Sequence, residues 1–176
     1  NPSAIREMLK LASPDMISFT AGNPSAVTFP QEELKEAIQE ILTNQPALAL
    51  QYSVTEGYAP LIEITKERLA TKYNIPVDSE MIITSGAQQA IDLAAKCLLN
   101  SGDVVICETP SFIGALNAFR SYGARLEGVP VDDDGMIVDA VEDILKREKR
   151  VKLIYTIPTF QNPTGTTMPM ERRKKL

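Results

Sequence analysis

The chain has 176 residues, of which 44% are hydrophobic and 23% are charged, with a formal net charge of −5 and no histidine. This composition is that of a globular protein, and the acidic balance argues against nucleic-acid binding. The lack of histidine excludes a Ser-His-Asp mechanism and a histidine-ligated zinc site within the chain. No apolar run approaches the ~18 residues of a membrane span.

The start of the chain and its two cysteines bear on the cellular compartment. Neither a signal peptide nor an initiator Met is present at Asn1, so we expect a chain that is cut at its front. Cys97 and Cys107 both lie in apolar patterns and are expected to be buried thiols. Such thiols are typical of a reducing compartment, which predicts a cytoplasmic protein.

The N-terminal part of the chain is predicted to be helical, with loops between the helices. Residues 5–12 have a short amphipathic pattern, and the loop at 21–24 contains Gly22, where a ligand could approach the backbone closely. A helix is expected to begin after Pro30. Its apolar residues recur at helical spacing on one face, at Leu34, Ala37, Ile38, Ile41 and Leu42.

The next segment is a polar loop followed by another helix. The loop spans 51–57 and contains Tyr52, which no packing pattern of its own segment explains. The helix is expected over 59–73, with Pro60 in its first turn, where proline is tolerated.

From residue 81 onward the sequence alternates between strand and helix patterns. Strands are expected at 81–84, 104–107, 125–129 and 151–157. Helices are expected at 86–99, 111–122 and 138–149, and the last residues, 172–176, belong to the start of a further helix. This alternation predicts an α/β fold, with a mainly parallel sheet and helices on both faces.

The last predicted strand runs into a dense turn sequence, Asn162-Pro163-Thr164-Gly165. Ligands of open α/β sheets bind beyond the carboxyl ends of the strands, which is where Asn162 lies. Its amide can donate and accept hydrogen bonds, so it could bind a phenolate or carbonyl oxygen. An ordinary turn is the alternative interpretation.

Two other strands are also followed by sequences suited to a ligand. Ser85, Gly86, Ala87 and Gln88 join a strand to a helix, where free backbone N–H groups could bind a phosphate. The alternative is a capping box between Ser85 and Gln88, which needs no ligand. After the next strand comes Phe112, which could stack on a flat ligand or belong to the core.

One acidic sequence could suggest a metal, but its context argues against one. Asp132-Asp133-Asp134-Gly135 lacks the Asp that an EF-hand needs two residues earlier, where Pro130 stands. A solvated turn is the better interpretation, so no metal site is predicted.

Together these motifs resemble the class I/II aminotransferases, the fold-type I enzymes that use pyridoxal 5′-phosphate (PLP), and among them the bacterial multi-substrate and 2-aminoadipate types. The resemblance covers the whole chain, in the family's order. It implies that Asn162 bonds the phenolic oxygen of PLP, that Ser85, Gly86, Ala87 and Gln88 form the phosphate cup, and that Phe112 stacks on the ring. It also implies that Gly22 contacts the substrate carboxylate.

The resemblance further implies a homodimer, in which Tyr52 reaches the cofactor phosphate of the neighbouring subunit. By the same likeness, Pro110 and Pro163 are expected to follow cis peptide bonds. Residues 1–45 would be an N-terminal arm and small-domain segment. Residues 46–176 would be the first part of the PLP-binding large domain.

The family's Schiff-base lysine, the Asp at the pyridine nitrogen and the carboxylate-binding Arg all follow the Asn-Pro-Thr-Gly motif, and no lysine of this chain matches the first. The resemblance therefore implies an N-terminal fragment of an enzyme that moves an amino group between an amino acid and a 2-oxo acid, and the 176 residues alone are expected to be inactive. A β-lyase of the same fold, the PLP-binding effector domain of a bacterial transcription regulator, and an interaction domain without a ligand are the alternatives.

Overall fold

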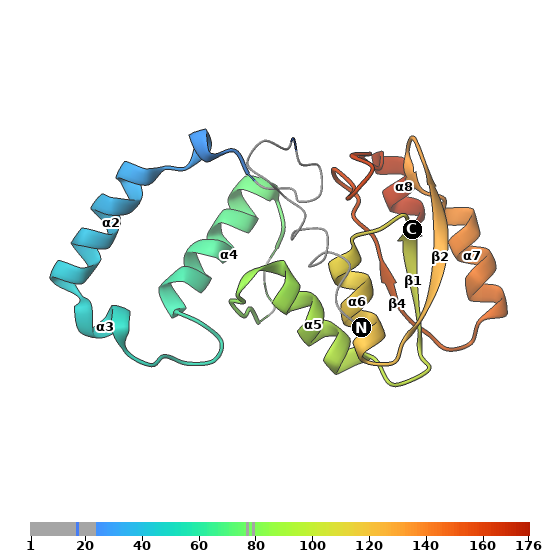
Figure 1. Cartoon of the computed structure of the whole chain (residues 1–176), viewed down its shortest axis with the longest axis horizontal. Coiled ribbons are helices and arrows are strands. Elements are labelled where there is room, and N and C mark those ends of the chain that lie inside the picture. Colours follow the sequence, from blue (N-terminus) through green and yellow to red (C-terminus); the bar gives the residue numbers. More distant parts are fainter. Residues whose placement is uncertain (1–16, 18–23, 77, 79) are drawn as a thin grey trace. The chain divides into compact units, whose positions relative to one another are not determined.

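The computed structural model describes residue 17, residues 24–76, residue 78 and residues 80–176 (Figure 1). The predicted helix at 5–12 and the loop with Gly22 lie outside the described residues. The chain divides into two compact units between Ser53 and Val54. This division lies beyond residue 45, where the sequence places a domain boundary, and the assignment of small-domain and large-domain segments stays a prediction.

Among the described residues of the first unit, the regular elements are all helices. They are η1 (Ala26–Thr28), α2 (Gln31–Asn44) and α3 (Pro46–Leu50). The helix predicted after Pro30 is confirmed as α2. Glu32 and Glu33 in its first turn interact favourably with the positive end of the helix dipole. The short helices η1 and α3 were not predicted, because three and five residues are too few to display a periodic pattern.

The second unit alternates helices and strands. In chain order its elements are α4 (Ala59–Tyr73), α5 (Gly86–Leu98), β1 (Val104–Thr109), α6 (Ile113–Ser121), β2 (Arg125–Asp132), β3 (Gly135–Met136), α7 (Val138–Arg147), β4 (Val151–Tyr155) and α8 (Met170–Lys175). The sheet has the order β3-β2-β1-β4. The central strand β1 pairs in parallel with both β2 and β4, and only the short β3 is antiparallel. The predicted mainly parallel sheet is confirmed.

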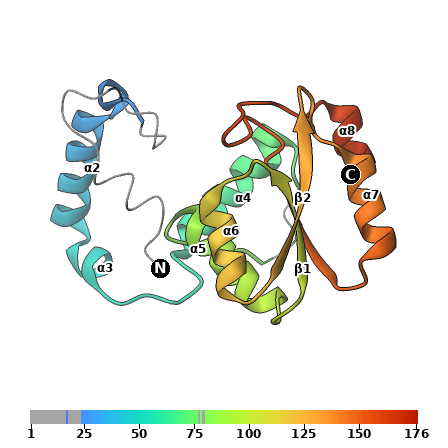
Figure 2. The same cartoon turned by 45° about the vertical axis from the view of Figure 1, so that its right-hand side comes forward.

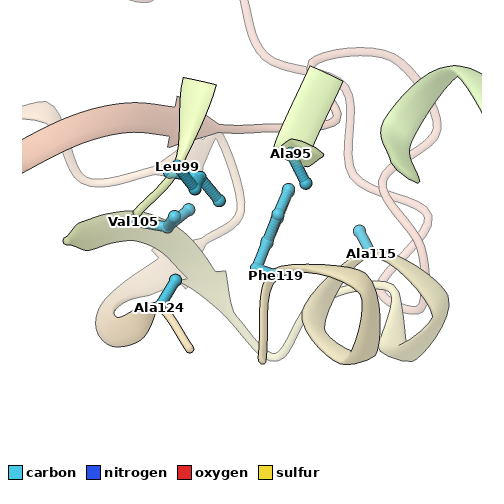
Figure 3. Packing of buried hydrophobic residues seen from close by; sticks show 6 residues of the cluster. All are labelled: Ala95, Leu99, Val105, Ala115, Phe119 and Ala124. Carbon is cyan, nitrogen blue, oxygen red and sulfur yellow. The ribbon is translucent and has the colours of Figure 1, made fainter. Parts of the chain in front are cut away.

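Helices cover both faces of this sheet, as Figure 2 shows for α5 and α6 on one side and α7 on the other. Successive residues of a strand point to opposite faces, so neighbours on β1 belong to different cores. Val105 packs with Ala95 of α5, with Leu99 just after that helix, and with Ala115 and Phe119 of α6 (Figure 3).

The opposite face has its own core cluster. Ile106, the neighbour of Val105 on β1, packs there with Val141 and Ile144 of α7 and with Met168. Strand β1 is therefore buried on both faces, which is typical of the centre of a parallel sheet.

Two sequence predictions are wrong. Residues 81–84 form no strand. The Ile83 N–H donates to the Glu56 carbonyl at 2.8 Å, and this one bond does not make a strand ladder. Cys97 is exposed, because it lies between the positions of the apolar stripe of α5. Cys107 is buried as predicted, and burial raises the pKa of its thiol.

No helix among the described residues is both long enough and apolar enough to cross a membrane.

The first prediction concerns the core between α6 and β4. Phe119 is 1% exposed, and its ring meets that of Tyr155 edge-on at 5.4 Å. We expect Phe119→Ala to lower the free energy of unfolding by about 3–5 kcal/mol, since it removes a buried ring and leaves a cavity. Denaturant unfolding measures this change. Phe160→Ala is the control, since Phe160 is 78% exposed, and a similar loss in both variants would contradict the assignment.

The second prediction concerns Asp103, a buried carboxylate between α5 and β1. The N–H of Asn100 donates to it at 2.8 Å and Arg150 at 3.0 Å, and these bonds hold its pKa below the ordinary value of 3.8. The stabilisation is therefore complete above the pKa of the unfolded chain and is lost as pH falls through the folded pKa.

We expect Asp103→Asn to destabilise the protein at neutral pH and to make the free energy of unfolding less dependent on pH in the acid range. Denaturant unfolding between about pH 2 and pH 7 measures both effects. Asp133→Asn, in the exposed turn between β2 and β3, controls for the loss of one negative charge. An unchanged acid dependence in Asp103→Asn would refute the role of Asp103.

Candidate functional site

The candidate site is built on the carboxyl ends of β1 and β4. Because these strands are parallel neighbours, the segments that follow them, Pro110–Phe112 and 156–169, leave the sheet at the same edge. Both carry residues that the sequence singled out, Phe112 and Asn162. The peptide bonds before Pro110 and Pro163 are cis, so that prediction is confirmed.

A buried glutamate joins the two segments. Glu108, near the end of β1, is 1% exposed. It accepts hydrogen bonds from the Thr156 hydroxyl at 2.6 Å, from the Ile157 N–H at 3.2 Å and from the Gln161 amide at 3.0 Å. A buried carboxylate is costly unless such donors compensate for lost water, so this contact fixes the chain beyond β4 against the end of β1.

The loop of residues 158–168 is closed at its base and folded back at its tip. Arg173 of α8 donates to the carbonyl oxygens of Pro158 at 2.6 Å and Met168 at 2.7 Å, which holds the two ends of the loop together. At the tip, the N–H of Gly165 donates to the Gln161 carbonyl at 2.6 Å. Gly165 has φ +76°, a left-handed conformation that glycine adopts without strain.

Asn162 lies at the tip of this loop, and its side chain is exposed. Among the hydrogen bonds of the described residues, none involves the Asn162 amide, whereas the neighbouring Gln161 is buried and fully bonded. The Asn162 amide is therefore available to a ligand at the carboxyl edge of the sheet.

The N-terminus of α5 is a second open group of donors. Ser85 is its N-cap residue, but the serine side chain makes no capping hydrogen bond. The alternative interpretation, a capping box between Ser85 and Gln88, is not formed, because Gln89, not Gln88, accepts from the Ser85 N–H, at 2.5 Å. The first-turn N–H groups of Ala87 and Gln88 have no acceptor within a helix, so they stay available to an anion.

Gly86 leaves space in front of these donors. It has φ +78°, and a Cβ placed on it would meet nothing within 4 Å. An anion can therefore approach the start of α5 without a side chain in its way.

Gln88 and Phe112 meet over the first turn of α6. The Gln88 amide donates to the Gly114 carbonyl at 3.1 Å. A Cβ on Gly114 would lie 2.4 Å from the Gln88 amide oxygen and 2.5 Å from the Phe112 ring, so no other residue fits there unchanged. Phe112 is partly buried against the first core cluster, which supports the core interpretation for one part of its ring.

The structure thus brings the start of α5, Phe112 and the loop with Asn162 to one edge of one unit. The other two predicted residues belong to the N-terminal part of the chain. Tyr52 belongs to the first unit and is 98% exposed, and Gly22 lies outside the described residues.

The acidic turn at 132–135 is a hairpin turn between β2 and β3, as predicted, and Arg172 bonds Asp132 there. Within the described part of the chain, no group of three or more His, Cys, Asp or Glu side chains is arranged to hold a metal ion.

Sequence reasoning missed Glu108, Gln161, Gly114 and Arg173, all of which shape the site. Glu108 carried a signal, since an acidic residue ends an otherwise apolar strand. Gln161 and Arg173 carried none, because their burial and contacts depend on how the loop folds.

The sequence is similar to that of known proteins. The family profile described as "Aminotransferase class I and II" matches residues 14–176. The chain is 44% identical to aromatic-amino-acid aminotransferase 1 of Thermococcus litoralis and 46% identical to 2-aminoadipate transaminase of Thermus thermophilus. Each alignment covers 99% of this chain, and the chain spans 43% of the length of each relative.

Solved structures agree. The structure of a kynurenine aminotransferase of Pyrococcus horikoshii, in complex with PMP, has a TM-score of 0.93 and 43% identity over 99% of this chain and 44% of that one. A more distant relative is an uncharacterized HTH-type transcriptional regulator of Bacillus subtilis, 33% identical over 92% of this chain and 33% of its own length. The family match over most of the chain and the two close relatives establish that this chain belongs to the class I and II aminotransferases.

Proposed function

We propose that the full-length protein is a PLP-dependent aminotransferase that moves an amino group between an amino acid and a 2-oxo acid. The observation that carries this proposal is the Asn162 amide, which makes no hydrogen bond to the residues that the structure describes. The loop holds this amide at the sheet edge that also carries Phe112 and the open start of α5. The described residues offer what PLP requires: donors for a phosphate, an aromatic ring and an amide for a phenolic oxygen.

Each residue has a definite task in this proposal. The N–H groups of Ala87 and Gln88 and the hydroxyl of Ser85 bind the phosphate, and Gly86 lets it approach. Phe112 packs against the ring, and the Asn162 amide donates to the phenolic oxygen. When bound, PLP supplies the electron-accepting ring that stabilises negative charge on the substrate's α-carbon. Gly22 contributes its backbone to the substrate carboxylate.

The proposal extends to the substrates, the cellular compartment and the remaining catalytic groups. The names of the relatives support an amino acid with an aromatic or long acidic side chain, with a 2-oxo acid as its partner. We propose a cytoplasmic enzyme, which the two free cysteines support. Residues 1–45 and 46–176 are proposed to serve a small and a large domain, and the Schiff-base lysine is proposed to come from outside these 176 residues.

A second candidate is an effector-binding domain of a transcription regulator, which the similarity to the Bacillus subtilis protein favours. A basic DNA-binding segment ahead of Asn1 would identify this case. The two close relatives named as aminotransferases favour the enzyme.

The third prediction tests Asn162 in the full-length protein. We expect Asn162→Ala to weaken PLP binding about tenfold to a hundredfold, because a hydrogen bond to a charged oxygen contributes ~1.5–3 kcal/mol. Fluorescence titration with PLP measures the dissociation constant. Asn117→Ala, which removes the same amide from α6, is the control. Equal PLP affinity of wild type and Asn162→Ala would contradict the role of Asn162.

The fourth prediction tests a homodimer with shared sites, in which Tyr52 reaches the neighbour's phosphate. The exposure of the Tyr52 side chain supports a role toward another subunit. The phosphate residues Thr84–Gln89 include no Lys or Arg, so a further donor would help to bind a dianion. Two-fold symmetry would give each site one Tyr52 from the partner.

Mixed dimers of one Tyr52→Phe subunit and one Asn162→Ala subunit make this test. If Tyr52 acts across the interface, both changes fall in one site and the other site is intact, so activity recovers to about half of wild type. If Tyr52 acts within its own subunit, each site carries one change and no recovery occurs. Activity per mixed dimer, purified with two different tags, decides between these results.

A further inference from the structure

Gln161 is the most completely bonded side chain of the candidate site. It is 2% exposed, and its amide nitrogen donates to Glu108 at 3.0 Å and to the Pro110 carbonyl at 2.9 Å. Its amide oxygen accepts from the N–H and the hydroxyl of Thr164, both at 2.8 Å. A primary amide has two donor hydrogens and two acceptor positions, so all four are in use.

The backbone of Gln161 is fixed as well. Its N–H donates to Thr166 O at 2.8 Å, and its carbonyl accepts from the Gly165 N–H at 2.6 Å. Rotation of this residue would break bonds on both its side chain and its main chain. The peptide bond that follows it leads directly to Asn162, so the direction of the Asn162 side chain depends on Gln161.

Glu108 is the anchor of this arrangement. No salt bridge of the described residues involves Glu108, although it is almost fully buried. Burial of a carboxylate with neutral donors only is unfavourable compared with an apolar residue of similar size. Its three donors come from Thr156, Ile157 and Gln161, which all belong to the segment that carries Asn162.

We propose that Gln161, held by Glu108, is a positioning residue that aims the Asn162 amide at the cofactor's phenolic oxygen. The inference rests on the proposed function, since it assumes that PLP binds at this edge. In this proposal Gln161 and Glu108 do not contact the cofactor. They act on it only by fixing the direction of the Asn162 side chain.

Two substitutions disturb the hydrogen bonding between Gln161 and Glu108 in different ways. Gln161→Met keeps a side chain of similar length but removes all four hydrogen bonds. Glu108→Gln leaves the Gln161 residue unchanged but weakens its anchor, because it places an N–H group where three donors converge and one donor loses its acceptor. Both variants should loosen the loop at 158–168.

The test is a double-mutant cycle in the full-length protein loaded with PLP. The readout is the pH midpoint of the absorption change of the bound cofactor, which a general loss of stability would not move. Asn162→Ala should raise this midpoint by about one unit, because the charged oxygen loses a donor. Gln161→Met and Glu108→Gln should raise it in the same direction, by up to the same amount.

The decisive comparison is the double variant. If Gln161 acts through Asn162, Gln161→Met causes no further shift in the Asn162→Ala protein. A full additional shift there, or no shift in the wild-type background, would overturn the positioning role. Should Gln161→Met fail to fold, Glu108→Gln combined with Asn162→Ala makes the same decision.

Two controls separate this inference from the function on which it rests. Glu127→Gln changes a strand glutamate that bonds Arg147 at 3.0 Å and not the loop, so it should leave the midpoint unchanged. A wild-type protein without any absorption band from bound PLP would overturn the proposed function and the positioning role together. A normal wild-type band with unresponsive Gln161 and Glu108 variants would overturn only the positioning role.

Discussion

The site depends on the parallel pairing of β1 with β4. This pairing brings the ends of two strands, distant in sequence, to one edge of the sheet, with Cys107 opposite Tyr155. The backbone ladder alone would leave the segments beyond it free to move apart. The buried carboxylate of Glu108 continues the connection past the last paired residue, through hydrogen bonds to Thr156, Ile157 and Gln161.

The rest of the second unit supports this edge from both sides. Val105 packs in the core on one face of the sheet and Ile106 in the core on the other face. Strand β1 therefore cannot tilt without disturbing both cores. On the first side, the contact between Gln88 and Gly114 holds the open end of α5 next to the segment with Phe112. Arg173 joins the two ends of the 158–168 loop, and Asn162 lies at the tip of that loop. The packed strands and helices of the second unit thus hold the start of α5 and the loop with Asn162 in place. The N–H groups of Ala87 and Gln88 and the Asn162 amide stay available to a ligand.

Most of the second unit could be predicted from the sequence, because its helices and strands have clear periodic patterns. The stripe of α5 and the apolar run of β1 are examples. The pattern at 81–84 failed because a strand also needs a neighbour, which periodicity does not reveal. Asn162 and Phe112 were found because loops after parallel strands are where ligands bind. The start of α5 was found because the free N–H groups of a helix N-terminus can bind a phosphate.

The supporting residues could not be found in this way. Gln161 has a polar side chain in a turn, and sequence reasoning expects such a residue to face solvent. Its burial follows from two long-range partners, Glu108 and the Pro110 carbonyl, which are separated from it by 53 and 51 positions. Likewise, Gly114 is restricted by Gln88 and Phe112 together, a constraint that exists only once α5 and α6 are packed.

The central claim is that the start of α5, Phe112 and Asn162 form one PLP site. A crystal structure of the full-length protein soaked with PLP tests it most directly. The account predicts phosphate density at the N–H groups of Ala87 and Gln88, with the Asn162 amide within about 3 Å of the phenolic oxygen. PLP bound elsewhere, or bound here with the Asn162 amide out of hydrogen-bonding range, would contradict it.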